Sequence, residues 1–197
     1  MINWTELVQS ANYYGTIGYT MVDVPWVVSR KIAMATCPSE DFLVTSNLGE
    51  LVGSAEQGFL QLDHDGLLGE GKFMAISPCF RVEEVLDDLH QNYFAKLELY
   101  VNEGELFGAM EKMAESARTS ARGQFHRMSM AQGVILPVPI LEETDAGFDL
   151  TAGGIELGSF GVRTFEDVSW AFGTGHAEPR MSSTINKFVD QVRQKGR

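Results

Sequence analysis

Charged and aromatic side chains alternate with apolar ones along a predicted pair of strands. Arg81 and Glu83 stand two residues apart, so on a strand they project from the same face of the sheet. On the returning strand Phe94, Lys96 and Glu98 share one parity, and the residues of the other parity are apolar. One face would therefore carry two cations, two carboxylates and an aromatic ring. It is either a binding surface for a charged ligand or the solvated outer face that is normal for an antiparallel sheet.

A second hairpin brings two carboxylates near each other. Gly153 and Gly154 form a good two-residue turn, which pairs Thr151 with Glu156. Asp149 then lies diagonally across from Glu156 on the same face. Carboxylates at that separation repel unless a cation lies between them, and Mg²⁺ favours carboxylates together with phosphate oxygens. The pair predicts a magnesium site, with two solvated carboxylates as the alternative.

A segment with two glycines leads into the last predicted helix. In Gly173-Thr-Gly-His-Ala-Glu-Pro-Arg180 the glycines allow a ligand to approach closely, and the arginine at the helix start can meet an anion. The alternative is a glycine-rich connection without a ligand. The sequence has no Walker loop, nucleophile elbow, His-x-x-x-His pair or complete dinucleotide fingerprint. Its four histidines are scattered, which favours surface or loop positions over a metal site.

Hydrophobic periodicity predicts the elements that position these residues. Their order is helix, strands, helix, strands, helix. It indicates an α+β fold with an antiparallel β-sheet flanked by helices, rather than alternating βαβ units. An extended segment over Tyr19–Ser29 is interrupted by Pro25. The predicted helices are Trp4–Tyr14, the latter part of Leu51–Leu62, Gly104–Met130 and Ser182–Arg193, and the predicted strands are Phe42–Val44, Phe73–Glu83, Tyr93–Val101, Val134–Ile140, Phe148–Ala152 and Ile155–Val162, with a small-residue strand before Arg180.

Length and composition predict one globular domain over residues 1–197. Hydrophobic residues make up 44% of the chain and charged residues 21%, an ordinary globular balance. The apolar runs are far shorter than a membrane span, and no secretory signal opens the sequence. Two cysteines are too few and too far apart to suggest a disulfide framework or a zinc site. We expect a reduced cytoplasmic protein with no membrane partner.

The formal net charge of −12 argues against a protein that holds DNA or RNA by charge alone, because phosphate contacts supply most of that affinity. Arg118, Arg122 and Arg127 form one local basic group on a predicted helix. A solvated helix face is the favoured interpretation of these three residues.

Five segments, in the same order along the chain, resemble the catalytic core of class II aminoacyl-tRNA synthetases. The strand pair at Phe148–Arg163 is similar to that of the Asp/Asn/Lys subclass, and its second half also looks like ammonia-dependent asparagine synthetase. The other segments are Gly18–Pro25, which looks like motif 1, Leu51–Glu56, which is similar to the loop that holds the amino acid, Cys79–Glu83 with His90–Glu98, which looks like motif 2, and Gly173–Arg180, which looks like motif 3.

The resemblance implies a role for each candidate residue in ATP chemistry. Arg81 would hold the α-phosphate and the attacking carboxylate. Glu83 would accept from the adenine amino group, Phe94 would stack on the ring, and Arg180 would cover its other side and reach the γ-phosphate. Asp149 and Glu156 would carry Mg²⁺.

The resemblance also implies a substrate site. Glu56 and Glu98 would receive the α-ammonium of an amino acid. Lys96 stands where relatives often have an uncharged residue and would contact the substrate carboxylate, and Arg163 stands where relatives place an arginine that reads the side chain. An acidic or amide substrate follows from Arg163, whereas Phe59 replaces the lysine of aspartate-binding relatives.

The expected function is therefore ATP-dependent activation of an amino acid or similar carboxylate as an adenylate, with release of pyrophosphate. The acidic motif 2 loop, and the expectation that no anticodon-binding domain accompanies this one, make tRNA a possible but unfavoured acceptor, beside ammonia, an amine or a carrier protein. The alternatives are a catalytically silent regulatory paralogue, and amidation of aspartate. Motif 1 implies a homodimer formed through the Gly18–Pro25 region.

Overall fold

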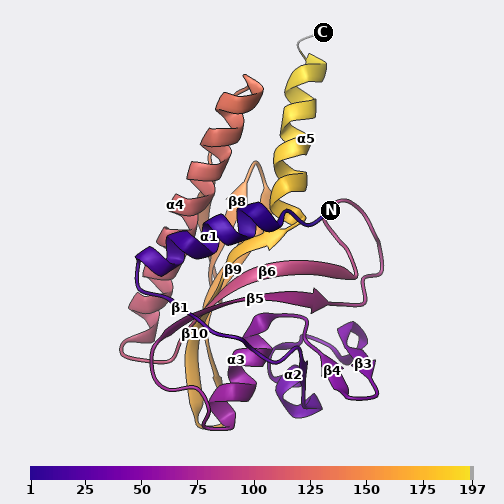
Figure 1. The fold of residues 1–197 in the computed structure, drawn as a ribbon. Helices are drawn as coiled ribbons and strands as arrows, with labels where there is room; N and C mark the ends of the chain where they lie inside the picture. The colour runs from indigo at the N-terminus through magenta and orange to yellow at the C-terminus, as the bar shows by residue number, and fades with distance from the viewer. Residues whose placement is uncertain (196–197) are drawn as a thin grey trace.

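The computed structural model describes residues 1–195, which form a large mixed sheet, a small sheet and helices around them (Figure 1). The large sheet has seven strands in the order β1-β5-β6-β10-β9-β8-β7, and the small one has the order β2-β4-β3. In the large sheet β1 runs parallel to β5, and the other neighbours are antiparallel. The elements are α1 Trp4–Thr16, β1 Thr20–Met21, β2 Val27–Val28, α2 Arg30–Thr36, a 3₁₀ turn (η1) Glu40–Phe42, β3 Val44–Ser46, β4 Gly49–Leu51, α3 Ala55–His64, β5 Lys72–Phe80, β6 Tyr93–Val101, α4 Leu106–Gln132, β7 Ile140–Thr144, β8 Gly147–Ala152, β9 Ile155–Phe165, β10 Val168–Glu178 and α5 Arg180–Lys195.

One face of the large sheet packs against α1, α4 and α5. Alternate residues of β6, Ala95, Leu97 and Leu99, are buried there, as their parity predicts. Leu7 and Tyr14 of α1 are seven residues apart and lie on the same buried stripe. In Figure 1, α1 crosses the sheet, while α4 and α5 extend beyond one end of it.

The opposite face is covered over only part of its length. There α2, α3 and the small sheet enclose a second core that contains Phe59, Tyr100 and Trp170. The Phe59 and Tyr100 rings stack with centroids 5.1 Å apart. Phe94, Lys96 and Glu98 share their face with Tyr100 but lie nearer the uncovered end of β6. The fold thus leaves part of a polar sheet face open.

The hairpin of β8 and β9 turns through Gly153 and Gly154, with φ values of 56° and 78°. Two successive positive φ angles suit the right-handed twist of a two-residue hairpin, and glycine adopts them without strain. The pairing of Thr151 with Glu156 agrees with the predicted register. A register shift between Leu150 and Thr151 then opposes Asp149 to Ser159.

The fold class is confirmed, but three predicted elements are wrong in extent or kind. Val134–Ile140 is not a strand, because Pro137 and Pro139 cannot donate to a ladder, and β7 begins only at Ile140. The strand predicted to reach Glu83 ends at Phe80. The strand predicted at Phe42–Val44 is divided between the end of η1 and the start of β3.

Two further elements, α2 and β4, were not predicted from the sequence. Ser29 caps α2 by accepting from the Ile32 N–H, and Glu50 of β4 is buried against Arg30 and Thr45. No helix within residues 1–195 is long and apolar enough to cross a membrane.

Candidate active site

Two connected hollows lie on the open face of the large sheet. The first, the cleft, has a volume of about 190 Å³ and lies among Arg81, Glu83, Phe94, Glu156 and Arg180. The second, the inner pocket, has a volume of about 140 Å³ and is lined by Thr36, Cys37, Ser54, Glu56, Glu98, Arg163 and Phe172, among others. Arg81, Lys96, Ser159 and Thr174 line both hollows, so they form a junction between them.

Arg81 and Glu83 are positioned by the loop after β5, not by strand geometry. The Arg81 N–H donates to the Asn92 backbone oxygen (3.1 Å), and the Glu83 N–H donates to Asn92 Oδ1 (2.9 Å). Both side chains still turn into the cleft, where Arg81 Nη1 lies 3.8 Å from Glu83 Oε1. The Arg81 guanidinium lies 5.6 Å from the centroid of the Phe94 ring. Asn92 is therefore a positioning residue that sequence reasoning missed.

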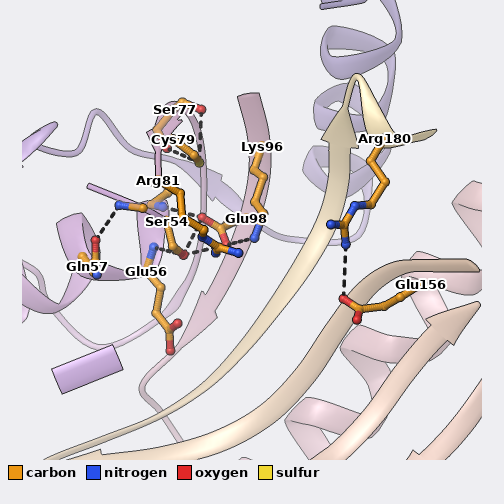
Figure 2. Close-up of polar contacts among 12 residues, drawn as sticks. Ser54, Glu56, Gln57, Ser77, Cys79, Arg81, Lys96, Glu98, Glu156 and Arg180 are labelled. Carbon is orange, nitrogen blue, oxygen red and sulfur yellow. Dashed lines mark hydrogen bonds and ion pairs between the residues drawn. The ribbon is translucent and has the colours of Figure 1, made fainter. Parts of the chain in front are cut away.

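Phe94, Lys96 and Glu98 project from one face of β6, as predicted. Lys96 Nζ lies 3.4 Å from Glu98 Oε1 and 5.8 Å from the Phe94 ring centroid. Glu98 also accepts from the Ser54 hydroxyl (2.7 and 2.8 Å) and from the Ala55 N–H. Figure 2 shows Glu98 held between Ser54 and Lys96. Because Ala55 is the first residue of α3, Glu98 places a negative charge at the start of that helix.

Glu56 is buried in the inner pocket beside Arg163 and Trp170. Trp170 Nε1–H donates to Glu56 Oε1 (2.8 Å), and Arg163 Nη1 donates to Oε2. Burial raises the pKa of Glu56, while Arg163 and the Trp170 donor pull that pKa downward. The Arg163 guanidinium also stacks on Phe172, 4.0 Å from the ring centroid. The structure thus joins two residues that the sequence placed in one site without predicting their contact.

Glu156 and Arg180 face each other across the cleft, with Arg180 Nη1 3.7 Å from Glu156 Oε1 (Figure 2). Asp149 is not among the residues that line the cleft, although its cross-strand partner Ser159 is. Partial burial raises the pKa of Asp149, and the negative charges of Glu156 and Glu142 raise it further. Within residues 1–195 the acidic side chains do not gather into a set of three or more arranged to hold a metal ion.

The glycines before Arg180 serve packing, which corrects the prediction that they admit a ligand. A Cβ on Gly173 would lie 2.2 Å from the Phe160 ring, and one on Gly175 would lie 2.9 Å from the Tyr14 ring. Both positions therefore face the core. Gly158, on β9, lines the cleft, and its Cβ would meet Thr174 at 2.8 Å. A single glycine in a strand gave no usable signal for this position.

A buried polar network lies behind the cleft. His176 contacts Ser10 Oγ (2.9 Å) through Nδ1 and Glu178 Oε1 (2.8 Å) through Nε2, and the Ser182 hydroxyl donates to the same Glu178 oxygen (2.9 Å). Glu178 is 0% exposed, and its Oε2 has no hydrogen-bond partner among residues 1–195. The network ties α1 and β10 to α5, the helix that starts with Arg180.

Comparison with solved structures shows the fold to be that of class II aminoacyl-tRNA synthetase catalytic cores. Pyrrolysyl-tRNA synthetase from Desulfitobacterium hafniense superposes with a TM-score of 0.67 at 16% identity, covering 94% of this chain and 70% of that chain. Serine-tRNA ligase from Naegleria fowleri in complex with AMP gives 0.64 at 16% identity, covering 92% and 52%. Seryl-tRNA synthetase from Pyrococcus horikoshii complexed with ATP gives 0.63 at 16% identity, covering 91% and 48%.

The present chain thus spans about half the length of the two seryl enzymes. No known family profile and no curated sequence matches it. The likeness to the Asp/Asn/Lys subclass stays a prediction, because these neighbours are pyrrolysyl and seryl enzymes.

Proposed function

We propose that this class II synthetase fold activates an amino acid or a similar carboxylate as an acyl-adenylate, using ATP and releasing pyrophosphate. One observation carries the proposal: the cleft and the inner pocket meet at Arg81 and Lys96, two cations shared by both hollows. A nucleotide in the cleft would place its α-phosphate at that junction, next to a carboxylate in the pocket. Holding both reactants in contact supplies much of the rate enhancement for such a reaction.

The cleft fits an adenine nucleotide. Phe94 offers an aromatic face for the base, Arg180 would cover the other side of it, and Glu83 offers a carboxylate for the amino group. Arg81 and Arg180 would meet the phosphates. Two neighbours that share this fold are complexes with AMP and with ATP, which supports a nucleotide at the corresponding place.

Asp149 and Glu156 fit a magnesium ion as oxygen donors. Burial raises the pKa of Asp149, and the negative charges of Glu156 and Glu142 raise it further, so a cation beside Asp149 and Glu156 would favour the ionised carboxylate. Mg²⁺ commonly takes one or two protein carboxylates and completes its shell with water and substrate phosphates, so a two-carboxylate set is sufficient. When bound, it would neutralise phosphate charge.

The reaction requires charge stabilisation rather than a general base, since a carboxylate is already a nucleophile. One oxygen of the substrate carboxylate attacks the α-phosphorus, and the bond from that phosphorus to the bridging oxygen of pyrophosphate breaks. Arg81 would contact the attacking oxygen and the α-phosphate together, and Lys96 lies at the same junction. A reaction without a general base is consistent with the cleft, where none of the described lining residues is a histidine.

Glu56 and Glu98 remain the proposed partners of a substrate α-ammonium. Each is already bound to a cation of the pocket, Glu56 to Arg163 and Glu98 to Lys96. An ammonium would therefore share their remaining lone pairs. The acceptor of the acyl group stays open among ammonia, an amine, a carrier protein and tRNA. The loop between β5 and β6, with Glu84, Asp87 and Asp88 exposed, favours acceptors other than a polyanion.

The test is carboxylate-dependent exchange of labelled pyrophosphate into ATP, screened with the whole chain over the twenty amino acids and simple mono- and dicarboxylic acids. Arg81→Ala should lower the exchange rate by about 10²–10³-fold, the usual cost of removing one donor to transition-state charge. Arg118→Ala is the matched control, since Arg118 pairs with Glu115 on α4 and lines neither hollow. Exchange that survives in Arg81→Ala would refute the role of this arginine. ATP binding without exchange for any carboxylate would favour a silent binding protein.

A further inference from the structure

A third hollow, the apolar groove, lies between the C-terminal part of α4 and the segment 133–139 that follows it. Its volume is about 620 Å³, which is larger than that of the cleft or of the inner pocket, and most of its lining residues are apolar. In Figure 1 this end of α4 extends beyond the sheet. The groove shares no lining residue with the cleft or the inner pocket, so it is separate from the proposed active site.

The wall formed by residues 133–139 is fixed in place before any partner binds. Gly133 ends α4 in the left-handed conformation, with a φ of 64°, and turns the chain back along the helix. Pro137 and Pro139 restrict the backbone of the wall. The Arg122 Nε–H donates to the Pro139 backbone oxygen (2.9 Å), which ties the wall to α4. Binding to a preformed groove of this kind costs little ordering entropy.

Exposed apolar side chains stand along both walls of the groove. Met130 of α4 is 74% exposed, and Ile135 and Val138 of the opposite wall are 90% and 63% exposed. Phe125 and Leu136 line the groove but are buried, so they form its floor. Apolar side chains gathered around a hollow mark an interaction site. A small ligand inside the groove would leave these exposed side chains in water, so the occupant must reach beyond the groove.

The groove carries positive charge although the protein is acidic. The net charge of the chain is −12, yet none of residues 116–141 is acidic. The described lining of the groove accordingly contains Arg122 and His126 and no carboxylate. Because Arg122, His126 and Met130 follow one another at intervals of four residues on α4, they lie on one side of the helix. This wall therefore changes from a cationic end to an apolar end.

Arg122 is available to a ligand, in contrast to the other two arginines of this helix. Arg118 pairs with Glu115, and Arg127 pairs with Glu6 (3.0 Å). Within residues 1–195 Arg122 forms no ion pair, and its one hydrogen bond to the wall uses Nε and leaves the Nη donors free. A guanidinium binds a carboxylate through two parallel hydrogen bonds. The charge of the groove thus favours a partner that places a carboxylate beside its apolar side chains.

We propose that the apolar groove binds an amphipathic helix of a partner protein, with apolar side chains in the groove and an acidic side chain on Arg122. A helix presents apolar side chains in a row with polar ones beside them, and it occupies grooves in this way. Addition of a strand along the wall is disfavoured, because Pro137 and Pro139 have no N–H to donate. The helix would cover Met130 and Ile135. This docking site does not depend on the proposed function.

Two other anionic partners fit the groove less well. A nucleic acid gains most of its affinity from several phosphate contacts, whereas the lining offers one arginine without a carboxylate partner and many aliphatic side chains. A membrane surface would contact the projecting Ile135 but would leave the floor at Phe125 and Leu136 uncovered.

Titration of three designed peptides against the whole chain tests the proposal. The first is an amphipathic helix with leucine along one face, two glutamates beside that face and glutamine elsewhere. The second has lysine in place of the glutamates, and the third has glutamine in place of the leucines. Fluorescence anisotropy would be measured at about 0.15 M salt, where a Debye length of about 8 Å limits repulsion from the rest of the acidic protein. We expect saturable binding of the first peptide alone.

Substitutions in the groove should weaken the binding of the first peptide. Met130→Gln and Ile135→Gln remove apolar contact, and Arg122→Gln removes the charge but keeps an N–H donor for the wall. Each should raise the Kd about tenfold or more. Leu67→Gln is the matched control and should bind like the wild type, since Leu67 is also 74% exposed but lies after α3 and does not line the groove.

Four outcomes would overturn the inference. The first is equal binding of the glutamate and lysine peptides, and the second is binding of none of the peptides. The third is binding of phosphatidylcholine–phosphatidylserine vesicles or of an RNA duplex, lost in both Met130→Gln and Arg122→Gln, because it would assign the groove to a membrane or to RNA. The fourth is a smaller mass of Ile135→Gln by light scattering, because it would place a second copy of this chain in the groove.

Discussion

Glu56 combines deep burial with two strong hydrogen-bond donors. Burial raises the pKa of this carboxyl above its ordinary value of 4.5, so the folded protein holds the proton more tightly than the unfolded chain does. The contribution of Glu56 to the free energy of unfolding is therefore greatest below pH 4.5. It falls as the pH rises through the folded-state pKa.

Urea unfolding at a series of pH values should show that the free energy of unfolding of the wild type falls with rising pH in this range. The Glu56→Gln variant should lack the part of this fall that comes from Glu56. Glu111→Gln, a substitution at an exposed site on α4, is the control and should keep the whole fall. If the free energy of unfolding changed with pH in the same way in the wild type and in Glu56→Gln, Glu56 would not have a raised pKa in the folded protein.

Phe94 gives a second prediction at the residue scale. If its ring stacks on adenine, Phe94→Ala should raise the KM for ATP roughly tenfold, from about 1–3 kcal/mol of stacking per base. Phe94→Tyr keeps an aromatic face and should stay near wild type. The readout is pyrophosphate exchange against ATP concentration. An equal loss in both variants would assign Phe94 to packing.

Asp149 gives a third prediction at the residue scale. Asp149→Asn should raise the Mg²⁺ concentration that gives half-maximal exchange, because it removes one of two proposed oxygen ligands. Glu142→Gln is the matched control, since Glu142 is the cross-strand partner of Asp149 but lies farther from the cleft, on β7. A larger effect from Glu142→Gln would move the proposed ion away from the cleft.

At the scale of elements, the β8–β9 turn offers a paired test. Gly153 and Gly154 both have positive φ, but a Cβ on Gly154 would meet open space, whereas one on Gly153 would lie 2.5 Å from the Phe188 ring. Gly154→Ala should cost about 1–2 kcal/mol of stability, the penalty of the left-handed region. Gly153→Ala should cost more, because Phe188 must also move. Chemical denaturation of the two variants measures the difference, and an equal cost would show that Phe188 yields freely.

The sequence predicted those elements whose pattern is local. The alternation along β6 identified both the core face and the face with Phe94, Lys96 and Glu98. The glycine pair identified the β8–β9 register next to the turn, but not the shift that opposes Asp149 to Ser159. The end of β5 was not predictable, because it depends on Asn92, eleven residues after Arg81. The Glu56–Arg163 contact joins α3 to β9, across 107 residues, and no local pattern reports such a pairing.

At the scale of the whole molecule, the Gly18–Pro25 region has features expected of a subunit contact. β1 is an edge strand that pairs with β5 on one side only within residues 1–195, and an unpaired edge is a template for association. Met21 and, just beyond the region, Trp26 are 47% and 52% exposed. The proposed homodimer would cover these apolar side chains.

Light scattering should therefore give the mass of a dimer, and Met21→Lys should shift the mass toward a monomer. Met130→Lys is the control, since Met130 is exposed near the end of α4, away from this edge. A monomeric wild type, or dissociation by Met130→Lys alone, would reject this edge as the contact.

The position of Glu98 limits how the ligand preference of the protein can evolve. The carboxylate that faces the inner pocket also accepts from the first residue of α3, and α3 carries Phe59 into the second core. A substitution that altered ligand preference at Glu98 would also weaken a helix on which folding depends. Arg163 has a structural duty too, because it pairs with the buried carboxylate of Glu56, which also belongs to α3. Evolutionary drift in ligand preference should therefore pass through the segment around Cys37, while Glu98 and Arg163 stay fixed.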